Sequence, residues 1–148
     1  MNKKMQIICA IGLVITLGSA PLMAAPLITA KEAALPPAAG TLATRGISRG
    51  PAVKLASPEA DTPVVAPFDF KVSFEPRGDA KIDPGSVKVV YMKSPFVDLT
   101  PRLKSAISAN GIDLAKADVP PGTHTIRVTV KDSEGRETNS VINLVVNK

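Results

Sequence analysis

The sequence of 148 residues contains no tryptophan and only one tyrosine, one histidine and one cysteine. A nucleophilic triad needs a histidine or another base beside its nucleophile, and the soft-ligand metal sites need cysteine or histidine clusters. Stacking platforms for sugars and bases use exposed aromatic rings, which are scarce here. The sequence therefore argues against catalysis, against a metal or organic cofactor, and against a nucleic-acid partner.

Carboxylates do not change this conclusion. The acids that could form a catalytic pair lie beside proline and glycine, where acids usually stabilise turns. The stretch from Asp132 to Gly135 has some features of a calcium loop, but a hairpin turn accounts for each of its residues. The candidate pairs would come from Glu59, Asp61, Asp79, Asp83 and Asp98.

The first 24 residues have the features of a secretory signal peptide. Lys3 and Lys4 precede an apolar run over residues 7–17, which is too short to span a bilayer, and small residues surround Ala24. We expect cleavage after Ala24, which also removes Cys9 and lowers the formal charge from +5 to about +3. The prediction is a periplasmic or secreted protein with no membrane span after cleavage.

Residues 25–51 are rich in alanine, proline and glycine and show no sustained periodicity. Such a segment buries too little apolar surface to offset its conformational entropy, so we expect a flexible tether. The remaining residues, 52–148, are enough for one small domain with a single core.

Within residues 52–148 the apolar period is two and turn signals recur every 8–12 residues or so, which is typical of an antiparallel sandwich. The pattern predicts a loop with Asp-Pro-Gly punctuation over residues 76–86. The clearest strands are the last two, which we expect to pair as a hairpin. The expected strands cover residues 52–58, 68–75, 86–93, 111–120, 123–131 and 141–146.

One stretch departs from this alternation. Leu99, Leu103 and Ile107 recur at a spacing of four, with Thr100 suited to a helix N-cap and Pro101 to the first helical position. The spacing predicts a short helical crossover that links the two sheets. Asn110-Gly111 is either the end of this helix or a tight hairpin turn.

Residues 52–148 resemble bacterial immunoglobulin-like domains. The resemblance lies in SPEADTPVVAPFDFKVSFEP near the start, IDPGSVKVVY in the middle and VPPGTHTIRVTVKDSEGRE near the end. It implies an all-β fold: a seven-stranded antiparallel immunoglobulin-like sandwich with one short helical crossover. It does not imply one function, because such modules serve as spacers, adhesin repeats, carbohydrate-binding accessories and docking domains.

The chain is also similar to a family of periplasmic copper-binding sandwiches, through Phe74-Glu75-Pro76 and the turn over residues 132–136. That family has a histidine at the mature N-terminus and another just after the turn. Here the mature chain is expected to start near Ala25, and Arg136 follows Glu134-Gly135 at the turn. Copper handling with altered ligands therefore stays an alternative only.

His124 is the one candidate for a catalytic base or ligand. Alternation places it on the apolar face of its strand with Ile126 and Val128. At a strand start, its ring can reach a backbone carbonyl, which favours a structural role.

Taken together, these features predict a non-catalytic binding or scaffolding module, without a cofactor, for an envelope or extracellular protein. The expected docking surfaces are an edge strand or the loops around residues 76–86 and 94–100. A second alternative is weak polysaccharide binding through Tyr91. The candidate partner-binding residues are Met92, Phe96, Arg77 and Asp79, two of which belong to an Arg-Gly-Asp tripeptide.

Overall fold

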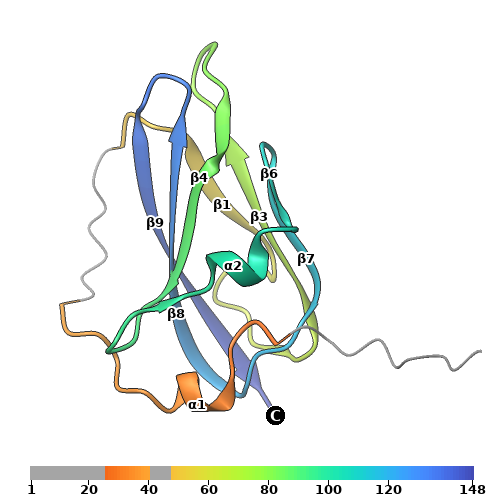
Figure 1. Cartoon of the computed structure of the whole chain (residues 1–148). Helices are drawn as coiled ribbons and strands as arrows, with labels where there is room; N and C mark the ends of the chain where they lie inside the picture. Colours follow the sequence, from red (N-terminus) through yellow and green to blue (C-terminus); the bar gives the residue numbers. More distant parts are fainter. Residues whose placement is uncertain (1–25, 41–47) are drawn as a thin grey trace, which may run out of the picture.

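The computed structural model describes residues 26–40 and 48–148. Two β-sheets pack face to face (Figure 1). The first short helix lies at the end of the sandwich near the chain's C-terminus, and the second lies along the side of the sandwich. The elements in chain order are α1 (Ala30–Ala33), β1 (Ala52–Ser57), β2 (Val64–Val65), β3 (Phe68–Glu75), β4 (Ile82–Tyr91), β5 (Val97–Asp98), α2 (Thr100–Leu103), β6 (Ile107–Ser108), β7 (Gly111–Ala117), β8 (Gly122–Asp132) and β9 (Glu137–Asn147).

The strand order establishes an immunoglobulin-like sandwich. One sheet has the order β1-β3-β7-β6 and the other the order β2-β9-β8-β4-β5, which corresponds to the two sheets of that fold with short strands added at their edges. All pairs are antiparallel except β2 with β9, which is parallel. The all-β prediction is confirmed.

The predicted number of strands is wrong, because the described residues form nine strands and not seven. Three of the nine, β2, β5 and β6, contain two residues each. A strand of two residues is too short to produce an alternating pattern, so these edge strands are set by the neighbours with which they pair.

The core lies between the sheets and follows the predicted alternation. In β8, His124, Ile126, Val128 and Val130 point inward, while the residues between them stay partly exposed. The hairpin of β8 and β9 forms as predicted and pairs over ten positions from Gly122↔Val146 to Lys131↔Glu137. Full burial of each large apolar side chain contributes about 1.5–3 kcal/mol, so this hairpin supplies a major share of the stability.

The stretch predicted as a loop over residues 76–86 is shorter than expected. β4 already begins at Ile82, where Ile82 and Asp83 pair with β8 before the register shifts ahead of Lys88. Asp83 Oδ1 accepts the N–H of Gly85 at 2.9 Å within this irregularity. Asp-Pro-Gly therefore forms a β-bulge inside a long strand, because proline has no N–H for the ladder.

The helical crossover is present and links β5 of one sheet to β6 of the other, as predicted. Its N-cap is Leu99 and not Thr100, because the Thr100 hydroxyl accepts the N–H of Val89 at 2.9 Å. The helix ends at Leu103, and Ile107 already belongs to β6. Ser108 pairs with Gly111, so Asn110-Gly111 belongs to a tight hairpin and does not end the helix.

The prediction of a flexible tether over residues 25–51 fails for the N-terminal segment, residues 26–40. Leu27 and Ile28 are 1% and 2% exposed and belong to the core. Thr29 and Glu32 form a capping box at α1. The overall composition of the segment suggested flexibility, but two adjacent apolar residues are enough to anchor it. They pack into the core at the open end of the sandwich, where the segment lies (Figure 1, orange).

Backbone hydrogen bonds also hold the N-terminal segment. Leu27 N–H donates to the Asp118 carbonyl at 2.9 Å, and Ala38 N–H donates to the Met92 carbonyl at 3.2 Å. Residues 41–47 of the predicted tether and the predicted signal peptide, 1–24, lie outside the described residues. In the part that is described, no helix has the length and hydropathy needed to cross a membrane.

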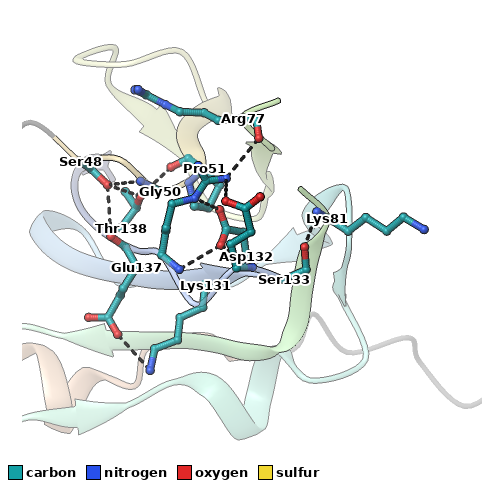
Figure 2. A network of polar contacts seen from close by, with 12 residues as sticks. Ser48, Gly50, Pro51, Arg77, Lys81, Lys131, Asp132, Ser133, Glu137 and Thr138 are labelled. Carbon is teal, nitrogen blue, oxygen red and sulfur yellow. Dashed lines mark hydrogen bonds and ion pairs between the residues drawn. The ribbon is translucent and has the colours of Figure 1, made fainter. Parts of the chain in front are cut away.

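The chain meets the sandwich again at its opposite end. The Ser48 hydroxyl donates to the Glu137 carbonyl at 3.1 Å, and the Thr138 hydroxyl donates to the Pro51 carbonyl at 2.7 Å (Figure 2). This end of the predicted tether is therefore also tied to β9, just before β1 begins.

Candidate functional site

His124 is buried and serves the core. Its Nδ1 lies 2.8 Å from the Tyr91 hydroxyl and its Nε2 lies 2.7 Å from the Pro120 carbonyl. Because the carbonyl can only accept, Nε2 carries the proton and Nδ1 accepts from Tyr91. Burial lowers the pKa of His124 and keeps the ring neutral. The expectation that the ring lies on the core face and reaches a backbone carbonyl is confirmed.

Tyr91 is fully buried beside His124, with the ring centroids 5.7 Å apart. Burial raises the pKa of its phenol. The alternative of a sugar stacked on Tyr91 therefore loses its basis, since the ring has no open face. Lys93 lies 5.4 Å from this ring and donates to the carbonyls of Ala33 and Leu35, so the cluster also holds the N-terminal segment.

The carboxylate of Asp132 is hydrogen-bonded within the turn between β8 and β9 (Figure 2). The Asp132 carboxylate accepts the N–H groups of Glu134 and Arg136 and the Arg136 side chain at 3.0, 2.9 and 2.8 Å. Burial alone would raise the pKa of Asp132, but these hydrogen bonds lower it. Both carboxylate oxygens are thus engaged in the turn, and the described residues contain no group of three or more metal-ligating side chains.

The four predicted partner-binding residues do not form one surface. Arg77 and Asp79 are exposed just before β4, whereas Met92 and Phe96 follow its far end. A strand of this length separates its ends by about 30 Å. Met92 is 8% exposed and packs into the fold, so its side chain does not contribute to an exposed binding surface. Phe96 is 58% exposed.

The large apolar side chains that remain exposed in the described residues are Val65, Phe96 and Val141, at 59%, 58% and 38%. Val65 is in β2 and Val141 in β9, and Phe96 directly precedes β5, so all three lie in or beside the five-stranded sheet. Neighbouring positions of β9 point into the core, which places Val141 on the outer face. This face is therefore the candidate docking surface.

Arg127 lies at the centre of this face. It pairs across the strands with Val90 of β4 and Val141 of β9, and its guanidinium carbon is 5.8 Å from the centre of the Phe96 ring. We call Val90, Phe96, Arg127 and Val141 the outer strip. A cation over an aromatic face is attractive, and aliphatic neighbours shield it from water.

Hydrogen-bonded polar pairs flank the outer strip on both sides. Thr125 donates to Asn143 Oδ1 at 3.1 Å, and Thr129 donates to Asn139 Oδ1 at 2.6 Å. The result is an apolar and cationic centre with a polar rim, which is the composition of protein-binding surfaces.

Sequence reasoning singled out Phe96 as a candidate, but not Arg127 or Val141. Alternation did place Arg127 on the face opposite Ile126, which the structure confirms. The missing information was the register, because only the pairing Arg127↔Val141 and the path of the β4–β5 connection bring the three side chains together. No local motif marks such a surface.

No protein-family model matches the sequence, and no curated protein is significantly similar to it. The structure of CopC from Methylosinus trichosporium OB3b is 16% identical over 65% of this chain and 94% of that chain, with a TM-score of 0.43. Fibronectin(III)-like modules of CbhA from Clostridium thermocellum are 19% identical over 65% of this chain and 46% of that chain, with a TM-score of 0.40. The chain thus has a distant likeness to both sandwiches, while its own sheet order establishes the fold.

Proposed function

We propose that this protein is a non-catalytic binding module of the cell envelope or the extracellular space, and that it docks a partner protein on the outer strip. The observation that carries the proposal is the exposed Phe96 ring stacked with Arg127 beside Val141. Aromatic residues and arginine at the centre of a desolvated patch contribute most of the binding energy in protein interfaces.

Addition of a partner strand at a sheet edge has less support. The five-stranded sheet ends in β2 and β5, which have only two residues each. At the edge of the other sheet, β1 carries Lys54, which is paired with Glu75. Short edges and exposed lysines are common protection against strand addition.

The alternatives from the sequence lose their key residues. Both ring nitrogens of His124 are engaged, so a copper site that uses it would first have to break these two hydrogen bonds. Polysaccharide binding by Tyr91 would need an exposed ring, but the Tyr91 ring is buried. The envelope or extracellular location rests on the predicted signal peptide.

Photo-crosslinking in the cells that make the protein tests the proposal. A p-benzoylphenylalanine in place of Phe96 should yield a crosslinked species, and Val141→Glu in the same chain should remove it. The matched control places the same probe at Lys54, which is exposed on the opposite sheet. Equal crosslinking from both positions, or none from position 96, would overturn the proposed docking face.

A further inference from the structure

The Arg127 side chain lacks hydrogen-bond acceptors among the described residues. Its Nε is buried without a partner, and its described side-chain contact is the Phe96 ring. An arginine carries five N–H donors, and a buried donor left without an acceptor costs about 1–3 kcal/mol. Arg102, by contrast, donates both to a carbonyl and to a carboxylate.

Arg127 borders a shallow cleft of about 410 Å³ on the outer face. Lys88 and Lys131 also line this cleft, and Glu137 is the acid among its lining residues. Lys131 lies 3.4 Å from Glu137, so this pair is largely neutralised. Arg127 and Lys88 have no ion pair among the described residues, and they leave the cleft with a net positive charge.

A second acid that feels the charge of Lys88 is Asp98 in β5. Its carboxylate accepts the N–H of Thr100 at 2.9 Å. Hydrogen bonds from Thr100, and the charge of Lys88 to a smaller extent, lower the pKa of Asp98. Asp98 is thus engaged with the start of α2 and does not satisfy Arg127.

We infer that Arg127, assisted by Lys88, binds a carboxylate from an acidic segment of the partner protein. A guanidinium presents parallel N–H groups that fit a carboxylate in bidentate fashion, and a ring stacked on it holds it in place. The exposed apolar surface of Phe96 and Val141 then requires an apolar side chain next to the acid. A protein segment supplies both groups, which favours it over a polyanionic glycan. This inference rests on the proposed docking face.

The test is an NMR titration of the isotope-labelled full chain with two synthetic peptides, Glu-Glu-Leu-Glu-Glu and Gln-Gln-Leu-Gln-Gln. The acidic peptide should shift the Arg127 Nε–H signal and the amides of Thr129 and Asn139. The glutamine peptide should bind at least about tenfold more weakly, because it cannot form the charge-assisted pair. Added salt should weaken the binding of the acidic peptide and leave the binding of the glutamine peptide unchanged.

Variants assign the effect to the named side chains. Arg127→Gln should lower the affinity for the acidic peptide at least about tenfold. Lys88→Gln should lower it less, because a lysine contributes a point charge without the parallel N–H donors of a guanidinium. Lys54→Gln, on the opposite sheet, is the control that should change nothing. Thermal unfolding of each variant shows whether the fold is kept.

Equal affinity for the two peptides, or no loss of binding in Arg127→Gln, would overturn the carboxylate assignment. Stronger shifts with inorganic phosphate or polygalacturonate than with the acidic peptide would overturn the choice of a protein segment. A partner crosslinked at position 96 together with charge-independent peptide binding would refute this inference alone. Charge-dependent peptide binding without any crosslink would refute the docking proposal alone.

Discussion

The guanidinium of Arg102 and the carboxylate of Glu32 are joined by two hydrogen bonds, of 2.8 and 2.6 Å. Arg102 is in α2, and Glu32 is in α1 of the N-terminal segment. The same guanidinium donates to the Leu27 carbonyl at 2.9 Å. One side chain of the helical crossover therefore holds the N-terminal segment across the end of the sandwich, next to the place where Leu27 enters the core.

This pair should make the stability depend on acidic pH. The hydrogen bond from Arg102 lowers the pKa of Glu32 to about 2, from 4.5. The folded pKa is below the unfolded one, so the contribution is complete above pH 4.5 and is lost as the pH falls toward 2. Glu32→Gln should remove this part of the pH dependence and lower the free energy of unfolding by about 1 kcal/mol near neutral pH.

Urea denaturation of Glu32→Gln and of the wild type at several pH values measures the effect. Glu75→Gln is the matched control, because it breaks the exposed pair with Lys54 and should change stability little. An equal loss in the two variants would show that the contact between Arg102 and Glu32 has no special role.

The N-terminal segment should be part of the cooperative fold. Leu27→Ala removes a side chain that is 1% exposed and packed in the core, so we expect a loss of about 2–5 kcal/mol. Leu35→Ala, in the same segment but outside the core cluster, should cost much less. Calorimetry of both variants decides the matter, and an unchanged transition in Leu27→Ala would restore the tether hypothesis.

Stability should also fall between neutral pH and mildly acidic pH because of His124, the only histidine in the chain. Burial lowers the pKa of His124 below 6.5, so the unfolded chain binds a proton that the folded protein does not. Stability is therefore highest above pH 6.5 and declines as the pH drops below it.

His124→Phe should abolish that decline and also lower stability at every pH. The phenyl ring leaves the Tyr91 hydroxyl and the Pro120 carbonyl without their partner, at a cost of about 1–3 kcal/mol for the buried hydroxyl and less for the half-buried carbonyl. The measurement is the free energy of urea unfolding on both sides of pH 6.5. A decline that persists in the variant would assign it to another group.

Gly111 cannot be replaced by alanine without damage. Its φ is +147°, and a Cβ built there would overlap the Val72 carbonyl of the neighbouring strand β3. We expect Gly111→Ala to lower the free energy of unfolding by at least about 3 kcal/mol. Gly78→Ala, at a φ of +62° but in open space, should cost only about 1–2 kcal/mol. Equal thermal shifts in the two variants would contradict this close approach.

Arg127 should be more useful for binding than for stability. Because its Nε is buried without an acceptor, Arg127→Met keeps the packing against Phe96 and removes an unsatisfied donor. We expect this variant to unfold at an equal or higher temperature and to lose its affinity for the acidic peptide. A clear loss of thermal stability would show that Arg127 has a structural partner after all.

The alternation of residues along β3, β8 and β9 made the sandwich predictable. A period of two assigns each side chain to a face before any partner is known, and this placed His124 and Ile126 in the core correctly. The crossover was predictable as well, since Leu99 and Leu103 share one helical face and are both buried.

The sequence by itself therefore determined the fold class, the hairpin, the crossover and the inward face of each long strand, because these depend on local spacing. Tertiary structure alone decided the anchoring of residues 26–40, the bulge after Asp83 and the outer strip. Leu27 becomes a core residue only when the open end of the sandwich receives it. Arg127 meets Phe96 and Val141 only through the register of β8 with β9 and the path of the chain after β4, and no local pattern encodes contacts between distant segments.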